Sequence, residues 1–361
     1  MQKTKKVLVL TDNMPWGHRS VARSIYGMLK EEKGDFEVEY VEHAISMDWW
    51  DAFYGSVYRI PNIGDILYYI SNLKISKKIL ENKIKQGDAK LTKLILSKKP
   101  DVVISAVNWY SQLVNRIENR KFKLVTLVTD PWRTYNISFV KGADWHFVYD
   151  EKMKQIATAN GIPKDKIVAT GWFVREEMYK KFKVKKSGKP VIFVGGGSLG
   201  TNAIPKILLA ILGIKKPVKI IMNCGKDKWM YSLVGLTKKI LKLRGKDKMI
   251  EIENHGWIEN IAEVLAKTDI VFGKAGPNFL FDCVAQEKPF VAITHVGHEV
   301  ANLDLIREKK LGWVKENYGE IKEFLNVFLD NPEKYKKIFA KTIKEEAGRN
   351  KKTMGKIAQI L

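Results

Sequence analysis

The chain contains little cysteine and no long apolar segment, and these two absences exclude several classes of protein. Its two cysteines, Cys224 and Cys283, are far apart in the 361 residues, so neither a disulfide framework nor a cysteine zinc site is expected. No run of about eighteen apolar residues is present, which predicts no membrane-spanning helix. The N-terminus lacks a signal-peptide pattern. We expect buried thiols and a cytoplasmic compartment.

Common metal-binding patterns are also missing. The sequence has no His-Glu-x-x-His motif and no Asp-x-Asp pair, the arrangements that hold zinc or a divalent ion on a sugar nucleotide. We therefore expect no metal and no resident cofactor.

Acidic residues are scarce relative to basic ones. Lys and Arg number 63 against 40 Asp and Glu, which gives a net charge of +23 and implies an acidic partner, unless the lysines only solvate helix surfaces. Residues 74–99 carry nine lysines and two acids, and residues 334–356 carry nine basic residues and two acids. Lysine is a poor reader of base edges. The excess therefore favours an anionic membrane surface over nucleic acid.

Short apolar runs alternate with amphipathic stretches along the whole chain, which predicts parallel sheets covered by helices on both faces. The expected strands are Val7–Thr11, Phe36–Val41, Val102–Ser105, Leu124–Thr129, Trp145–Val148, Val191–Val194, Val218–Asn223, Met249–Glu253, Ile270–Phe272 and Phe290–Ile293. A polar Gly/Pro stretch interrupts the pattern before Val191. We predict an α/β protein with two Rossmann-like domains facing a cleft, residues 1–182 and 190–340, and a C-terminal helix, 341–361, packing back on the first domain.

The most informative segment follows the expected strand Ile270–Phe272. Glycines, a lysine and a proline that opens a helix come directly after that strand. Such a turn places backbone N–H groups and a helix dipole where a phosphate binds, and a carboxylate further along the helix reaches ribose hydroxyls. The expected donor-binding residues here are Lys274, Ala275, Gly276, Pro277, Asn278 and Asp282, with Gly297, His298 and Glu299 after the next strand.

Other glycine-rich turns follow the strands of the second half. In open parallel sheets, ligands bind beyond the carboxyl ends of the strands. The turns there add Gly196, Gly197, Ser198, Gly225, Trp257 and Ile258 to the expected donor site. The first of these turns is not a Walker loop, because no Gly-Lys-Ser/Thr follows it. Plain structural turns are the competing interpretation.

Two residues of the first half have the chemistry of a general base. His18 follows the first strand and begins a helix, and a helix N-terminus favours the neutral imidazole that a base requires. Asp130 follows a later strand, where it is expected either to orient His18 or to take the proton itself. A polar helix cap and a turn-forming Asp before Pro131 are the simpler alternatives.

An aromatic-rich stretch precedes the lysine-rich segment 74–99. Trp and Tyr beside basic residues suit the headgroup region of a membrane, although aromatics at helical spacing are more often core. The expected acceptor and membrane residues are Trp16, Gly17, Trp49, Trp50, Tyr58, Arg59, Pro61 and Tyr68.

With these motifs in view, the chain resembles the GT-B glycosyltransferases of the monogalactosyldiacylglycerol synthase and processive diacylglycerol glucosyltransferase family over nearly its whole length. The matching segments are His18 to Ala22, Tyr58 to Tyr68, Thr129-Asp130, Gly171 with Val174-Arg175, Gly195 to Gly197, Gly273 to Pro277, and Gly297 to Glu299 with Asn302. The turn from Gly273 to Pro277 is the most specific of them.

The resemblance implies metal-independent, inverting transfer of a hexose from a UDP-sugar to a lipid hydroxyl such as that of diacylglycerol. The enzyme would be peripheral on the inner face of the cell membrane. His18 would deprotonate or orient the acceptor, Asp282 would hold the ribose, and His298 and Glu299 would contact the sugar. This chain departs from the family at three places. It has Pro15-Trp16-Gly17 where the family has Gly-Gly-Gly before the histidine. It also has Asp282 where the family has Glu, and His298 where the family has Gln.

Three alternative functions remain open at this stage. Within the same fold, the chain is compatible with the N-acetylglucosaminyltransferase of polyprenyl-linked peptidoglycan precursors or with a UDP-sugar 2-epimerase. The first alternative is weakened because the Gly-Gly-Thr-Gly-Gly-His loop is absent. A basic nucleic-acid-binding protein is the non-enzymatic alternative, and no nucleic-acid-reading module supports it.

Overall fold

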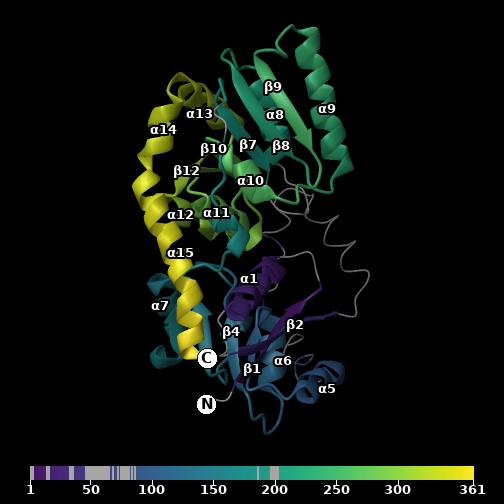
Figure 1. Ribbon diagram of the computed structural model, residues 1–361, viewed down its shortest axis with the longest axis vertical. Helices are drawn as coiled ribbons and strands as arrows, with labels where there is room; N and C mark the ends of the chain where they lie inside the picture. Colours follow the sequence, from purple (N-terminus) through teal and green to yellow (C-terminus); the bar gives the residue numbers. More distant parts are fainter. Residues whose placement is uncertain are drawn as a thin grey trace. The chain divides into compact units, whose positions relative to one another are not determined.

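The protein is described from a computed structural model that defines residues 4–13, 17–31, 36–44, 87–184, 187–195 and 203–361, and the isolated positions 66, 69, 70, 73, 82 and 84. It divides into two compact units, residues 1–176 with 349–361 and residues 177–348 (Figure 1). The observed boundary lies slightly earlier in the chain than the polar Gly/Pro stretch from which we predicted it.

The first unit contains a six-stranded parallel sheet. The strands are β1 Lys5–Asp12, β2 Phe36–His43, β3 Val102–Ser105, β4 Lys123–Leu127, β5 Trp145–Val148 and β6 Ile167–Ala169. Their order is β2-β1-β3-β4-β5-β6, and every neighbouring pair is parallel. The order reverses direction between β1 and β3, and their carboxyl ends are therefore the expected position of a ligand site.

Helices with one apolar face cover this sheet. They are α1 Gly17–Glu31, α5 Ala89–Lys98, α6 Asn108–Asn115 and α7 Glu151–Ala159. In α1, the buried residues Val21, Ile25 and Met28 recur at helical spacing. Apolar residues of α5 and α6 form one core cluster with β1, β3 and β4, and α7 packs in a second cluster with β5 and β6.

The end of the chain belongs to the first unit. The last helix, α15 Ala340–Ile360, reaches Leu361, whose carbonyl oxygen accepts a hydrogen bond from Lys5 Nζ at 2.6 Å. Ile357 is fully buried, and Lys356 Nζ lies 3.5 Å from the carbonyl oxygen of Ala169. The C-terminal residues therefore complete the unit that the N-terminal strand begins.

The second unit repeats the architecture. Its strands are β7 Val191–Gly195, β8 Val218–Asn223, β9 Ile250–His255, β10 Ile270–Lys274, β11 Phe290–Thr294 and β12 Gly312–Val314. Their order is β12-β11-β10-β7-β8-β9, again with all pairs parallel. The reversal falls between β7 and β10, so the turn that follows β10 stands at the switch point of this sheet.

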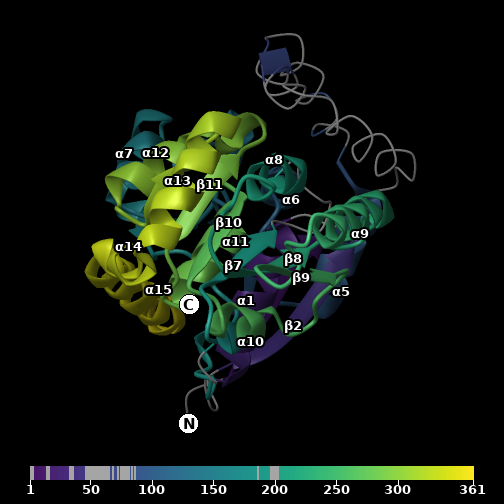
Figure 2. The same ribbon diagram turned by 90° about the horizontal axis from the view of Figure 1, so that it is seen from above.

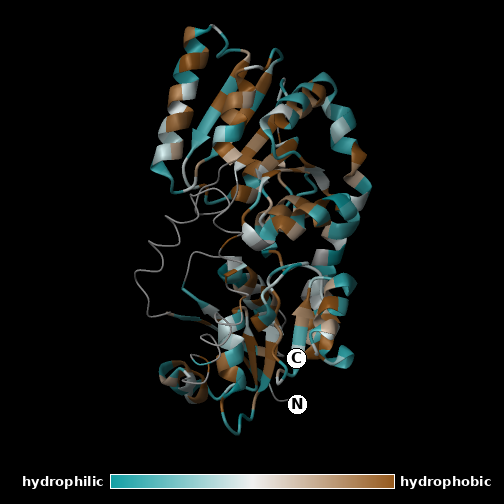
Figure 3. Ribbon diagram, turned by 180° about the vertical axis from the view of Figure 1, so that it is seen from behind, coloured by the Kyte–Doolittle hydropathy of each residue, from teal (hydrophilic) through white to brown (hydrophobic). Residues whose placement is uncertain are grey.

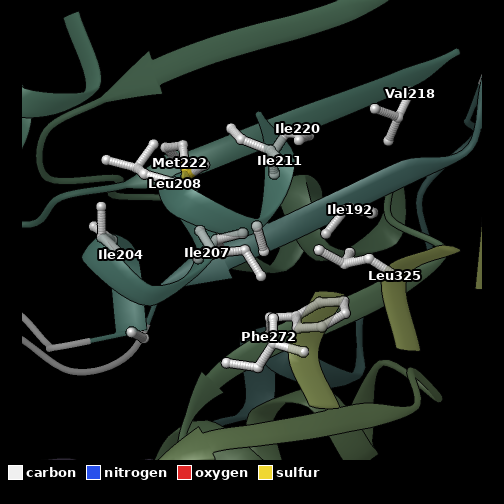
Figure 4. Close-up of a cluster of buried hydrophobic side chains, with 14 of the residues drawn as sticks. Ile192, Ile204, Ile207, Leu208, Ile211, Val218, Ile220, Met222, Phe272 and Leu325 are labelled. Atoms are coloured by element: carbon white, nitrogen blue, oxygen red, sulfur yellow. The ribbon is translucent and has the colours of Figure 1, made fainter. Parts of the chain in front are cut away.

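Helices again flank the strands (Figure 2). They are α8 Ala203–Ile211, α9 Lys228–Leu243, α10 Ile261–Ala266, α11 Pro277–Ala285, α12 Val300–Glu308, α13 Tyr318–Asp330 and α14 Pro332–Ile338. Figure 4 shows the core under α8 and α13, in which Ile207 of α8 and Leu325 of α13 approach Ile192 and Phe272 of the sheet. No described helix is both long and apolar enough to cross a membrane.

The predicted fold class is confirmed, since both sheets are parallel and Rossmann-like, and each predicted strand coincides with an observed one. One prediction was wrong in detail, because β4 ends at Leu127 and leaves Asp130 in the connection after it. The strands β6 and β12 were missed, because three residues are too few to show a period. Both cysteines are buried, as expected.

Gly273 allows the two strands at the second switch point to lie close together. A Cβ atom at this position would lie 2.5 Å from the carbonyl oxygen of Gly195 on β7. We expect Gly273→Ala to lower the free energy of unfolding by about 2 to 3 kcal/mol, because backbone must move. Chemical denaturation measures the change. Gly235→Ala in α9 is the control, since no atom lies within 4 Å of a Cβ at that position. This variant should raise the free energy of unfolding by up to about 1 kcal/mol. Equal effects would contradict this interpretation.

A buried histidine predicts acid sensitivity of the first unit. Burial lowers the pKa of His146 from 6.5 to about 4, and its Nε2 accepts a hydrogen bond from Val140 N at 3.0 Å. Because the unfolded chain takes up a proton at higher pH than the folded unit, stability is full above pH 6.5 and falls as the pH drops towards 4. Denaturation at several pH values should show this loss, and His146→Gln should reduce it. If the free energy of unfolding of that variant depended on pH as it does in the wild type, His146 would not be the cause of the acid sensitivity.

Candidate active site

The first unit holds a histidine–aspartate pair at the carboxyl end of β1. His18 is the second residue of α1, and its Nδ1 lies 3.4 Å from Oδ2 of Asp12, the last residue of β1. The Asp12 side chain is completely buried, whereas that of His18 retains 22% of its exposure. A buried carboxylate beside one ring nitrogen selects the tautomer that carries a proton there, which leaves Nε2 able to accept one.

The second oxygen of Asp12 is unusual for a buried carboxylate. Among the described residues, neither Oδ1 of Asp12 nor Oδ1 of Asn108, at the start of α6, has a hydrogen-bond partner. Asp12 ends β1 and Asn108 lies shortly after β3, and these two strands are neighbours in the sheet. Both oxygens thus stand at the switch point of the first sheet, where a ligand is expected to bind.

Asp12 was not among the residues that we singled out from the sequence. The structure places the carboxylate of Asp12 next to His18, and the expectation that Asp130 orients His18 stays a prediction. Asp130 is also buried, and its Oδ2 accepts a hydrogen bond from Thr134 Oγ1 at 3.3 Å. Asp12 could have been found as an acid that directly ends a predicted strand on the way to His18. A direct role for Asp130 stays a prediction.

In the second unit, the structure confirms the strand, turn and helix around Gly276. β10 ends at Lys274, Gly276 is the N-cap of α11, and Pro277 is its first residue. The N-cap residue Gly276 has no side chain with which to cap this helix, and a helix N-terminus attracts an anion. Ala275 N donates to Thr294 O at 2.8 Å, and Gly276 N donates to Lys274 O at 2.7 Å. The amides of Ala275 and Gly276 are thus used within the fold, and anion binding at the first turn of α11 stays a prediction.

Lys274 and Glu299, to which we assigned separate parts of the donor, form one ion pair. Glu299 is buried and its other oxygen accepts from Val296 N at 3.0 Å. A Cβ atom at Gly276 would lie 3.3 Å from both Lys274 Nζ and Glu299 Oε1. The positive charge expected at the turn is therefore accompanied by a carboxylate, and both lie beside the helix start.

Asn302 of α12 is hydrogen-bonded to the turn that precedes α11. Its side-chain Nδ2 donates to Ala275 O at 2.7 Å, and it is only 3% exposed. Gly297, with φ of +49°, and His298 begin the short 3-10 helix η4 Gly297–Glu299 that leads into α12. The side chain of His298 lies outside the described part. Asp282 lies in the second turn of α11 and is 8% exposed, so its assignment to ribose stays a prediction.

The loops after β8 and β9 supply the remaining described donor residues. Gly225 adopts φ of +58°, and its N–H donates to Asn223 Oδ1 at 3.1 Å. Lys226 Nζ lies 5.9 Å from the centre of the Trp257 ring, whose side chain is 58% exposed. Ile258 follows in the same loop. An aromatic ring near a cation at a strand end is compatible with stacking on a base.

Several predicted residues lie outside the described part of the chain. They are Trp16, Trp49, Trp50, Tyr58, Arg59, Pro61, Tyr68, Gly196, Gly197 and Ser198. Gly17 begins α1. Among the described residues, no three His, Cys, Asp or Glu side chains gather as metal ligands.

Comparison with known proteins gives the same assignment for both halves of the chain. Residues 18–174 match the family model for monogalactosyldiacylglycerol synthase, and residues 191–353 match the glycosyltransferase family 28 C-terminal domain. A processive diacylglycerol beta-glucosyltransferase of Bacillus cytotoxicus is 24% identical over 92% of this chain and 88% of its own length. The Bacillus pumilus enzyme of the same name is 24% identical over 92% and 89%.

Solved structures share the fold. MurG of Acinetobacter baumannii superposes with a TM-score of 0.61 at 14% identity, covering 99% of both chains. The UDP-GlcNAc 2-epimerase of Neisseria meningitidis gives 0.59 at 17% identity, covering 98% of this chain and 99% of its own. Together with the two family matches and the two Rossmann-like units, this shows that the chain is a glycosyltransferase and belongs to the GT-B family of the monogalactosyldiacylglycerol synthases and processive diacylglycerol glucosyltransferases.

Proposed function

We propose that this enzyme transfers a hexose from a UDP-sugar to the hydroxyl group of a lipid such as diacylglycerol, with inversion at the anomeric carbon. The observation that carries the proposal is the completely buried carboxylate of Asp12 beside His18. The relatives named as processive diacylglycerol beta-glucosyltransferases supply the substrate class.

The reaction is a single displacement in this proposal. His18 Nε2 accepts the proton of the lipid hydroxyl while Asp12 holds the proton on Nδ1 and stabilises the imidazolium that forms. The lipid oxygen bonds to the anomeric carbon, and the bond to UDP breaks with its electron pair going to the phosphate oxygen. The first unit thus supplies the base and the acceptor site.

The second unit binds the donor in this proposal. The N-terminus of α11 and the ammonium of Lys274 stabilise the negative charge that develops on the leaving diphosphate. Glu299, which is ion-paired to Lys274, fixes the position of that ammonium and offers an acceptor to sugar hydroxyls. Trp257 binds the nucleobase of the donor, and Asp282 binds its ribose.

The lipid acceptor places the enzyme at a membrane, and four exposed side chains support this. Ile66, Tyr69, Ile70 and Leu73 are 47% to 68% exposed and follow the spacing of one helix face. The lysine-rich segment 74–99 comes directly after them. We propose that this part of the first unit docks on anionic lipid. Vesicle binding should then require anionic lipid and weaken with salt, and equal binding to neutral vesicles would refute it.

Product analysis tests the proposed reaction. The protein is incubated with UDP-glucose or UDP-galactose and a lipid extract, and the lipid fraction is analysed by mass spectrometry. With one of the two donors, we expect a lipid that has gained one or more hexose residues. One molecule of UDP should be released for each hexose transferred. Turnover that yields only a free, altered sugar nucleotide would refute lipid transfer and favour an epimerase.

A further inference from the structure

The helix α9 of the second unit exposes a line of large apolar side chains. Trp229, Leu236 and Leu243 are 64%, 54% and 88% exposed. The opposite face of the helix is buried through Met230, Val234, Thr237 and Leu241. In Figure 2, α9 runs along β8 and β9 at the edge of the second sheet, and in Figure 3 the hydrophobic colour recurs along its length. The exposed line is therefore additional to the face that the fold uses.

The spacing makes the line continuous. Residues seven apart lie almost above one another on a helix, with a drift of about 20° per heptad. Leu233 and Ile240 are half-buried and fall between the exposed residues. Apolar side chains thus recur every three or four residues from one end of α9 to the other, forming a strip next to the packed face.

The charges on α9 are all of one sign. The helix contains Lys228, Lys238, Lys239 and Lys242, all exposed, and no Asp or Glu. The acid just before it, Asp227, is engaged as the N-cap and accepts from Trp229 N at 3.0 Å and Met230 N at 3.1 Å. An apolar strip beside a row of lysines, on a helix that carries no acid, complements a surface that is negative outside and apolar beneath, which is the character of an anionic lipid layer.

We propose that α9 is a lipid-docking helix, a contact with anionic membrane made by the second unit and separate from residues 66–73 of the first. The exposed strip enters the acyl boundary while the lysines reach the phosphates with extended stems. A second copy of α9 is a poor partner, because its lysines would face these lysines and two heptads are too short for a stable coiled coil. Phosphates of nucleic acid would satisfy the lysines but leave the apolar strip exposed.

A reporter at the centre of the strip tests this directly. Both native cysteines are buried, so the full-length Leu236→Cys protein takes an environment-sensitive fluorophore at one accessible thiol. Leu209→Cys is the matched control, because Leu209 is 59% exposed on α8 of the same unit. With phosphatidylglycerol vesicles we expect a blue shift and a two-fold or greater rise in emission at position 236 and little change at position 209. Phosphatidylcholine vesicles alone should have no effect.

Other outcomes would overturn the proposal. These are vesicle binding without a change at position 236, a change with protein concentration in the absence of lipid, or a change with duplex DNA and not with vesicles. As a second measurement, Leu236→Glu with Leu243→Glu should weaken vesicle binding about ten-fold or more, whereas Leu209→Glu should not. The rate of hexose transfer to a detergent-solubilised acceptor should be equal in the wild type, the double variant and Leu209→Glu. Its loss in every protein, including the wild type, would indicate failure of the proposed reaction and not of the docking helix.

Discussion

His18→Ala is expected to reduce kcat by about 10²- to 10⁴-fold, the range that a positioned general base contributes. Affinity for UDP should remain within about two-fold, because His18 lies in the first unit and the donor residues lie in the second. Initial rates with saturating donor and calorimetric titration of UDP measure the two quantities. A variant with unchanged kcat would remove His18 from the mechanism.

Asp12→Asn should show how the base is held. The carboxylate lies 3.4 Å from His18 Nδ1, and an amide in its place can donate to that nitrogen and shift the proton to Nε2, where the base must be free. We expect kcat to fall about 10²-fold with the UDP Kd unchanged, because the imidazolium that forms loses its stabilising charge.

The chain offers a matched control for this change. Asp88 pairs with His43 at 2.9 Å in the same unit, and its other oxygen caps α5 through Leu91 N at 2.8 Å, a role that Asn also fills. Asp88→Asn should therefore leave kcat unchanged. If both aspartate variants lost activity equally, the effect of Asp12 would be structural and not specific to His18.

The second large effect is expected at the helix that binds the donor. Gly276→Asp should weaken UDP binding about 10²-fold or more, because it places a carboxylate at the N-terminus of α11 where the diphosphate is proposed to bind. The fold should be retained, since Asp is a favoured N-cap residue and the three atoms nearest to its Cβ belong to the flexible ends of the Lys274 and Glu299 side chains.

Gly276→Asn separates charge from size in this experiment. Asn has the same shape and is an equally good N-cap, so it should cost far less UDP affinity than Asp does. Titration of UDP into both variants, with thermal denaturation as the test of folding, gives the comparison. Equal affinity in the two variants would show that no anion binds at this helix start.

Apolar patterns and local chemistry made much of this predictable. Strands such as Val218–Asn223 are apolar and bounded by turns, and a glycine directly before Pro277 marks the start of a helix. Short strands such as Gly312–Val314 have no such signal. The ion pair between Lys274 and Glu299 could not be predicted from the sequence. The two residues are 25 positions apart, and they meet only because the chain brings η4, which contains Glu299, back to the turn after β10.

The same limit applies to Asp12 and α9. Asp12 ends a strand and resembles any acid at a strand end until α1 brings His18 back to it. In α9, apolar residues every three or four positions predict a buried helix, and only the packing of the sheet shows that Met230, Val234 and Leu241 suffice for the core while Trp229, Leu236 and Leu243 remain outside. Sequence thus indicates which residues are apolar or reactive, and tertiary structure determines which of them are exposed or paired.

The configuration of the sugar linkage in the product tests the proposed mechanism most directly. If the lipid hydroxyl, deprotonated by His18, attacks opposite the departing UDP, an α-linked UDP-hexose must give a β-linked glycolipid. The proton coupling at the anomeric carbon, measured by NMR on the purified lipid, distinguishes the two linkages. We predict the large coupling of a β-linkage with either hexose, and an α-linked product would contradict single displacement by a base at His18.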